Sequence, residues 1–117
     1  MSTDTEVQSQ AGTTRLCTAA QIDYKAYKRP YDGQSGAPVL NLFASCFYGS
    51  APWVLSFEAV NGEPNTYKLM EKVPGIVYFL VTNYAVSHSS GYGVIDLADT
   101  ITIIDAHGSH KVKVEAL

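Results

Sequence analysis

Hydrophobic and polar residues alternate along two neighbouring stretches of the sequence, residues 100–105 and 110–115. Alternation with a period of two is typical of a β-strand with one face on a core and the other in water. A short polar link containing a glycine joins the two stretches, so the pattern predicts a β-hairpin. Within it, Ile101 and Ile103 point to one face, and we expect that face to lie on the core.

The same pattern predicts further strands upstream. Residues 22–27 alternate, and Pro30 ends them because proline cannot donate to a strand ladder. Asn61-Gly62 is a strong hairpin signal, since both residues tolerate the positive φ of a tight turn. The remaining predicted strands cover residues 39–48, 53–60, 66–70 and 76–82. Residues 83–90 are predicted to form a polar connection, or a short strand followed by a loop.

These short strands at close spacing predict the fold class. About seven of them are counted, and tyrosine, valine, isoleucine and threonine are abundant in them, which favours strands over helices. We predict an all-β protein, built as a two-sheet β-sandwich of about seven strands over residues 22–117.

The N-terminal region follows a different pattern. Residues 1–12 are mostly polar, and we expect a flexible arm. Residues 13–21 predict a short helix that a threonine could cap. Its apolar stripe is too small for the helix to stand alone, so it needs a partner surface. Helix and sandwich together make a single domain, residues 13–117.

Composition narrows the choice of partners. The 117-residue chain has a formal net charge of −3 and no basic run, so nothing marks it for nucleic acid or for an anionic membrane. No stretch is long and apolar enough to cross a bilayer, and the polar first residues lack the apolar segment of a secretory signal, so we expect a soluble protein. Cys17 and Cys46 are interpreted as two buried thiols, although sequence alone leaves their pairing open.

Three side chains near the predicted hairpin turn, Asp105, His107 and His110, are of types that bind zinc. A solvated hairpin tip explains them better, because three ligands without supporting partners are a weak signal. The sequence also lacks a nucleophile elbow, a phosphate-cradling loop and a complete dinucleotide motif. We therefore predict no catalytic residue, no metal site and no cofactor, and thus a protein that is not an enzyme.

Three short motifs occur in the order in which one known family has them. They are Ile22-Asp23-Tyr24, then Val60-Asn61-Gly62, and then Gly-Tyr-Gly-Val at residues 91–94 followed by Ala-Asp-Thr at 98–100 and Thr-Ile at 102–103. The third motif has three residues inserted at 95–97. On these motifs the chain resembles the fungal immunomodulatory proteins, the Fve-type family of small, non-enzymatic, lectin-like mushroom proteins, over most of its length from about Thr14.

The resemblance implies a fibronectin-III-like or immunoglobulin-like β-sandwich preceded by a short helix that pairs with its counterpart in a homodimer. It implies binding of cell-surface glycans or glycoproteins and stimulation of immune cells, without membrane insertion. Members of the family lack a conventional signal peptide, which favours export by another route. The dimer contacts assigned to the helix are Leu16, Cys17, Ala19 and Ala20.

The resemblance also implies a carbohydrate site. Tyr31 stands where the family has a loop tryptophan, and Ser35 and Asn41 fall on a threonine and an aspartate of the family. The Thr-Ile pair of the family is kept as Thr102 and Ile103. An aromatic ring beside hydrogen-bonding groups suits the apolar face and the hydroxyl rim of a sugar. The alternative is a fibronectin-III-like protein–protein interaction module that has lost carbohydrate binding, with Tyr31 in an ordinary exposed loop.

Overall fold

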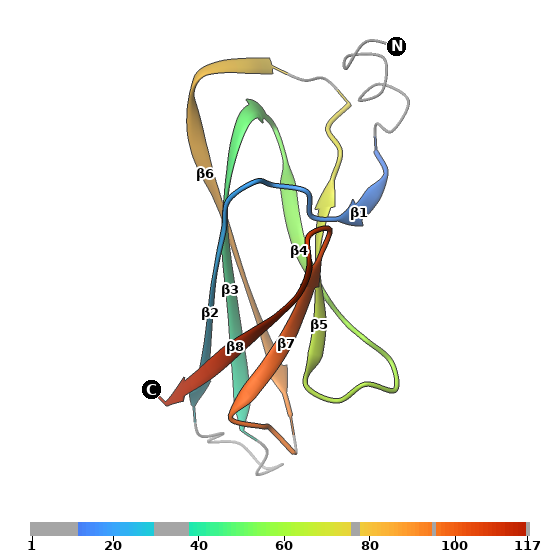
Figure 1. The fold of residues 1–117 in the computed structure, drawn as a ribbon, viewed down its shortest axis with the longest axis vertical. Helices are drawn as coiled ribbons and strands as arrows, with labels where there is room; N and C mark the ends of the chain where they lie inside the picture. The colour runs from blue at the N-terminus through green and yellow to red at the C-terminus, as the bar shows by residue number, and fades with distance from the viewer. Residues whose placement is uncertain (1–11, 30–37, 76–77, 95, 117) are drawn as a thin grey trace.

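The computed structural model of the protein describes residues 12–29, 38–75, 78–94 and 96–116 (Figure 1). These residues contain no helix, and therefore none long and apolar enough to cross a membrane. The all-β fold class is confirmed. The strands are β1 (Thr14–Leu16), β2 (Ile22–Arg29), β3 (Val39–Ala51), β4 (Val54–Ala59), β5 (Thr66–Lys72), β6 (Tyr78–Gly93), β7 (Thr100–Asp105) and β8 (Gly108–Ala116).

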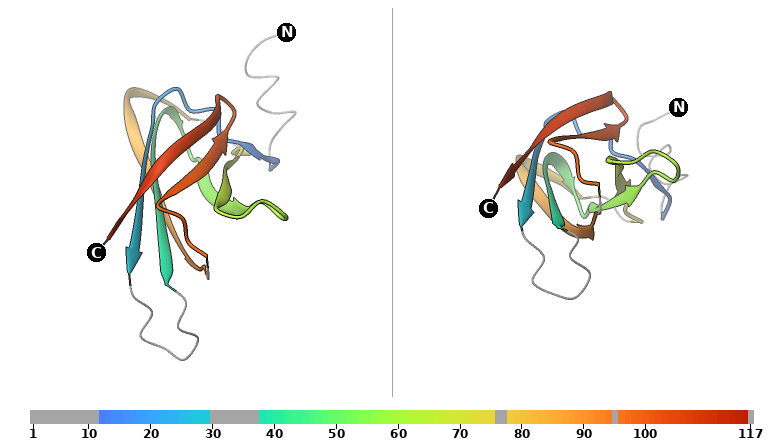
Figure 2. Two further views of the ribbon diagram at one scale, coloured as in Figure 1. Left: turned by 60° about the horizontal axis from the view of Figure 1, so that its bottom comes forward. Right: turned by 90° about the horizontal axis from the view of Figure 1, so that it is seen from below.

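The strands form one sheet, which curls around a single interior, as Figure 2 shows. Its hydrogen-bonded order is β1-β5-β7-β8-β2-β3-β6, and β4 also pairs with β5. The curl brings β4 close to β6, where the rings of Phe57 and His88 lie 5.8 Å apart. Because the order is continuous, the structure does not establish the predicted division into two stacked sheets.

The hairpin predicted from alternation is confirmed as β7 and β8, which pair antiparallel. Ile101 and Ile103 are fully buried, whereas Thr102 and Ile104, which alternate with them along β7, are half-buried on the other face. The turn places Gly108 at a φ of 124°, a backbone conformation that L side chains rarely adopt. A glycine at this position therefore allows the tight return of β8.

The hairpin predicted at Asn61-Gly62 is also confirmed, since β4 and β5 pair antiparallel on either side of it. Gly62 and Asn65 both take a positive φ, of 80° and 57°. The Asn65 side chain donates from Nδ2 to the Asp96 carbonyl at 3.1 Å and accepts from the Ala98 N–H at 3.0 Å. The β4–β5 loop is thus held to the segment that leads into β7.

The prediction for residues 83–90 is wrong. They belong to β6, which pairs antiparallel with β3 as far as Gly93. Side chains alternate along this stretch, with Ser87 and Ser89 exposed and Val86 and His88 half-buried. Ser87 and Ser89 therefore mark the solvent-exposed face of a strand, and the high polarity of the stretch concealed the period of two.

The N-terminal helix predicted over residues 13–21 is wrong as well. The segment contains β1, which pairs antiparallel with the end of β5. Beyond β1, the Cys17 N–H donates to the Leu69 carbonyl at 2.9 Å. The small apolar stripe could not support a helix alone, whereas β5 offers an edge beside β7 with free hydrogen-bonding groups.

This correction changes the surroundings of the four residues that were assigned to a dimer. Cys17 and Ala19 are buried in the core of their own chain, at 0% and 5% exposure. Leu16 is half-buried and Ala20 is exposed. Only the last two therefore have surface that a second protomer could contact.

The core lies on the inner face of the curled sheet. Its largest fully buried apolar side chains come from β3, β5 and β7, and they are Leu40, Leu42, Leu69, Ile101 and Ile103. Near β4 the Trp53 ring stacks on Tyr48 with the centroids 4.9 Å apart. Two carboxylates, Glu71 and Asp105, are buried in the same interior.

Candidate binding groove

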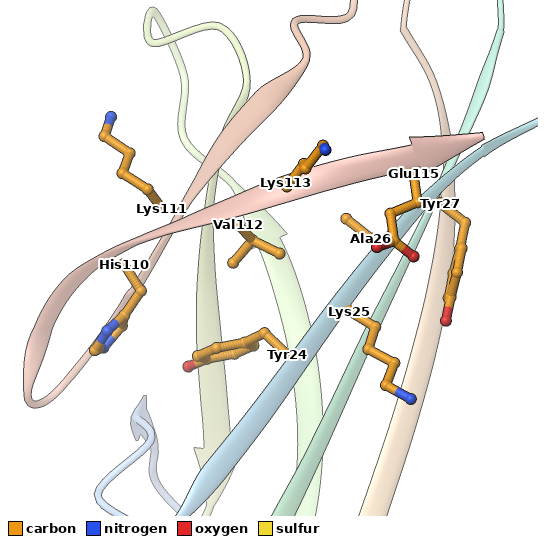
Figure 3. A pocket seen from close by; sticks show the side chains of 9 residues that line it. All are labelled: Tyr24, Lys25, Ala26, Tyr27, His110, Lys111, Val112, Lys113 and Glu115. Carbon is orange, nitrogen blue, oxygen red and sulfur yellow. The ribbon is translucent and has the colours of Figure 1, made fainter.

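A groove opens between β2 and β8, which run parallel but pair only from Ala26↔Val114 to Lys28↔Ala116. Before that point the two strands separate, because β2 continues along β3 while β8 continues along β7. The space between them is an open groove of about 630 Å³ (Figure 3). Residues 24–27 line it from β2, and residues 110–113 together with Glu115 line it from β8.

The inner side chains of both strands form the floor of the groove. Figure 3 shows His110 and Val112 on the side of β8 that faces Tyr24. All three are half-buried. The rings of Tyr24 and His110 lie 5.7 Å apart and tilted, so the floor is largely aromatic and apolar.

The rim of the groove is cationic. It carries the exposed side chains of Lys25, Lys111 and Lys113, with Glu115 as the acidic member. Lys111 Nζ donates to Thr102 Oγ1 at 2.8 Å. Together β2 and β8 hold five of the eight lysines and arginines of the chain and only two of its acidic residues. A chain with a net charge of −3 therefore concentrates positive charge at this groove.

A buried carboxylate lies below the floor. Asp105 is 2% exposed and accepts hydrogen bonds from Tyr24 Oη at 2.5 Å and from the His107 N–H at 2.8 Å. His110 Nε2 lies 2.9 Å from the same carboxylate. Burial alone would raise the pKa of Asp105, but these contacts outweigh it and lower the pKa. Burial, followed by the bond to Asp105, raises the pKa of Tyr24, so the phenol keeps its proton and acts as a donor.

A second buried carboxylate, Glu71, is fully enclosed. It accepts hydrogen bonds from Thr18 Oγ1 at 2.7 Å, Tyr48 Oη at 2.8 Å and Arg15 Nε at 3.0 Å. Burial would raise the pKa of Glu71, but the hydrogen bonds prevail and lower it. Glu71 therefore stays ionised, and it joins the segment after β1 to β3 and β5.

The two cysteines lie next to this network as free, buried thiols, which confirms their interpretation from the sequence. Their Sγ atoms are 3.8 Å apart, and Tyr48 Oη lies 3.4 Å from Cys17 Sγ. The contact with Cys17 and burial both raise the pKa of the Cys46 thiol. Cys46 is thus an inert core side chain rather than a nucleophile.

The stability of the fold is expected to fall at acid pH. Glu71 and Asp105 have folded pKa values below their ordinary values, so the unfolded chain takes up protons first as the pH falls. Their stabilisation is complete above about pH 4.5 and is lost as the pH falls through the folded values. The urea midpoint, measured from about pH 7 down to pH 3, should decrease below about pH 4.5. A midpoint that is constant over this range would contradict paired, ionised carboxylates.

The residues assigned to carbohydrate from the resemblance fall in different places. Tyr31 and Ser35 lie outside the described residues. Asn41 is half-buried on β3, directly opposite Tyr27 of the groove. Thr102 lies on β7 and contacts Lys111 on the other side of the groove. Ile103 points into the core with no exposed surface. The structure thus brings Asn41 and Thr102 to opposite flanks of one groove and leaves Ile103 beneath the sheet.

The hairpin residues considered as zinc ligands do not converge on one point. Asp105 and His110 are in contact, whereas His107 Nε2 lies 2.8 Å from the Ala19 carbonyl. In the part of the chain that the structure describes, no three histidine, cysteine, aspartate or glutamate side chains are placed to hold a metal ion. The three residues instead hold the β7–β8 turn against the segment between β1 and β2.

Sequence reasoning missed the groove itself. The alternation of residues 110–115 already placed Lys111 and Lys113 on one wet face, and that of residues 22–27 placed Lys25 and Tyr27 on another. What it could not supply was the pairing of β2 with β8, which lie far apart in the sequence. A search for neighbouring strands that share lysines on their wet faces could have suggested the groove.

The chain was compared with known proteins at the level of sequence and of structure. No protein-family model matches it, and neither the curated proteins nor the solved structures include a significant match.

Proposed function

We propose that this chain is a lectin-like protein of the fungal immunomodulatory kind, which binds cell-surface carbohydrate as a homodimer and stimulates immune cells without catalysing a reaction. The proposal rests on the resemblance of its sequence motifs. The observation that carries it is the β2–β8 groove, in which aromatic rings and hydrogen-bonding groups line one open cavity.

The size and the lining of the groove suit a sugar. Ligand sites commonly measure about 300 to 1,000 Å³ and combine apolar surface with a few polar groups. The groove of about 630 Å³ lies within that range. The half-buried ring of Tyr27, at the end of the groove where β2 pairs with Glu115 of β8, offers a surface for the apolar face of a pyranose ring.

Hydrogen-bonding groups surround this apolar surface. Tyr24 and Lys25 of β2 line the groove and have no strand partner on that side, so their backbone groups that do not bond to β3 can face a ligand. Asn41 and Thr102 do not line the groove, but each lies on the strand next to one of its walls and carries a group that can bind sugar hydroxyls.

A glycan array read with the purified full-length chain tests this proposal. We expect wild type to bind, Tyr27→Ala to lose binding because the ring surface is removed, and Tyr27→Phe to keep most of it. Val54→Ala is the matched control, because Val54 is 58% exposed on β4, away from the groove. Absence of glycan binding by wild type would overturn the proposal, as would equal binding by Tyr27→Ala.

One further observation favours the alternative, a fibronectin-III-like protein–protein interaction module. Phe43 is 41% exposed on β3, and its ring packs edge-on against Tyr27 at 5.6 Å. An exposed aromatic pair of this kind is typical of a protein contact surface. Should the array stay empty while Phe43→Ala abolishes capture of a protein partner, this alternative replaces the lectin.

A further inference from the structure

We propose that the β2–β8 groove selects acidic polysaccharides, namely glycans that carry sulfate or uronate groups, over neutral ones. This inference rests on the proposed carbohydrate function and adds the class of ligand. The supporting observation is the positive charge at the rim of the groove, which the family resemblance does not imply.

The rim offers three ammonium groups for ligand anions. In the described part of the chain, neither Lys25, Lys111 nor Lys113 is in an ion pair within the structure. Lys111 donates to the neutral Thr102 hydroxyl, which leaves its charge uncompensated. An exposed lysine without an acidic partner can bind a sulfate or a carboxylate through charge-assisted hydrogen bonds.

The spacing of the lysines suits a chain of repeated anions. Lys111 and Lys113 lie two residues apart on the same face of β8, about 7 Å along the strand. Lys25 lies on the opposite wall of the groove (Figure 3). Figure 3 shows Lys111 and Lys113 extending from the side of β8 that faces away from Tyr24, so they lie along the outer edge of that wall. An extended polysaccharide that lies over this edge would meet both of these charges, with Lys25 across the groove.

The acidic groups nearby do not cancel this charge. Asp105 is buried below the floor and already accepts from Tyr24 and from the His107 N–H. Glu115 is the only carboxylate among the groove-lining residues that the structure describes, and it lies at the end where β2 and β8 pair. Asp23 is exposed on β2, two residues before Lys25 on the same face, but it is not among the groove-lining residues. The described lining therefore carries three lysines against one carboxylate.

A glycan fits these groups better than a nucleic acid. The described lining of the groove contains no arginine, which is the side chain that binds phosphate through two hydrogen bonds. Three lysines and an aromatic floor instead suit an acidic polymer whose sugar rings can pack on that floor.

Affinity measurements on the full-length chain with heparin, desulfated heparin and neutral dextran test the inference. Desulfated heparin keeps its uronate carboxylates, so we expect both heparin polymers to bind at least about tenfold more tightly than dextran, and heparin most tightly of the three. The double variant Lys111→Gln with Lys113→Gln should lose about tenfold in heparin affinity and show a shallower salt dependence. The matched control, Lys68→Gln with Lys72→Gln on β5, changes the net charge equally and should keep wild-type affinity.

The other outcomes separate this inference from the proposed function. Equal binding of neutral dextran and heparin would leave the lectin proposal standing and overturn the selection of acidic glycans. An equal loss of heparin affinity in both double variants would show that acidic glycans do not bind at the groove. Binding of single-stranded RNA as tight as that of heparin would also overturn it, because the protein would then attract any polyanion. Failure to bind any of the three polymers would overturn the selection of acidic glycans, and the glycan array would then show whether the lectin proposal fails as well.

Discussion

Replacing Glu71 with leucine is expected to lower the free energy of unfolding by about 3 to 5 kcal/mol, because the groups that now donate to its carboxylate, above all the buried Tyr48 hydroxyl, would lose their acceptor. Thr18 and Tyr48 both donate to Glu71, and Tyr48 is itself a buried side chain. Arg15, with a third of its side chain exposed, can turn to water and adds less to the loss. Urea unfolding followed by circular dichroism measures the difference.

Two further variants serve as controls for this measurement. Glu58→Gln removes a carboxylate from the exposed surface of β4 and should change stability by about 0.5 kcal/mol or less. Glu71→Gln keeps the shape of the side chain but removes its titration, so part of the acid sensitivity of wild type should disappear in it. A loss below about 1 kcal/mol in the leucine variant would show that Glu71 is not the centre of a buried ionised network.

The second large effect is expected for Ile103→Ala, which should lower the free energy of unfolding by about 2 to 5 kcal/mol. Ile103 has no exposed surface, so the change leaves a cavity between β7 and the rest of the core. Its neighbour Ile104 is the matched control, because it has the same side chain on the opposite face and is only half-buried. We expect Ile104→Ala to cost about 1 kcal/mol.

Comparison of Ile103→Ala with Ile104→Ala also distinguishes two roles for Ile103. As a core residue, it should affect glycan binding only as far as the variant unfolds, so affinity per folded molecule should match wild type. A variant that folds stably and has lost its affinity would instead restore the direct ligand contact that the resemblance implies. Calorimetric titration below the unfolding transition distinguishes the two.

Local sequence patterns predicted part of the fold. Alternation placed Ile101 and Ile103 in the core, and the Asn-Gly pair and the polar link with Gly108 located two turns. The same alternation was missed in the polar residues 83–90. The local pattern also misled at residues 13–21, where a threonine-rich segment with small apolar residues gains its structure from the edge of β5 rather than from its own sequence. Tertiary pairing therefore overrode local preference at the N-terminal segment.

The candidate site depends even more on tertiary pairing that the local sequence does not predict. The sequence predicted a strand for each wall of the groove, with the lysines on its solvent-exposed face. Nothing local to residues 22–29 indicates that they lie beside residues 108–116, since that pairing depends on the order of the whole sheet. Chemistry that depends on two distant strands needs the fold before it can be recognised.

The pairing of β2 with β8 also bears on how the chain folds during synthesis. β2 leaves the ribosome early and β8 leaves it late, so one edge of β2 stays unpaired until nearly the whole domain has been synthesised. Such non-local contacts are typical of slow folding, and an unpaired strand edge can pair with the same edge of another nascent chain. Lys25, Lys28 and Arg29 lie along that edge, and charges of one sign on an edge oppose such pairing. Of these three, Lys25 also lines the groove, so its charge would oppose pairing between unfinished copies of the chain until β8 is made.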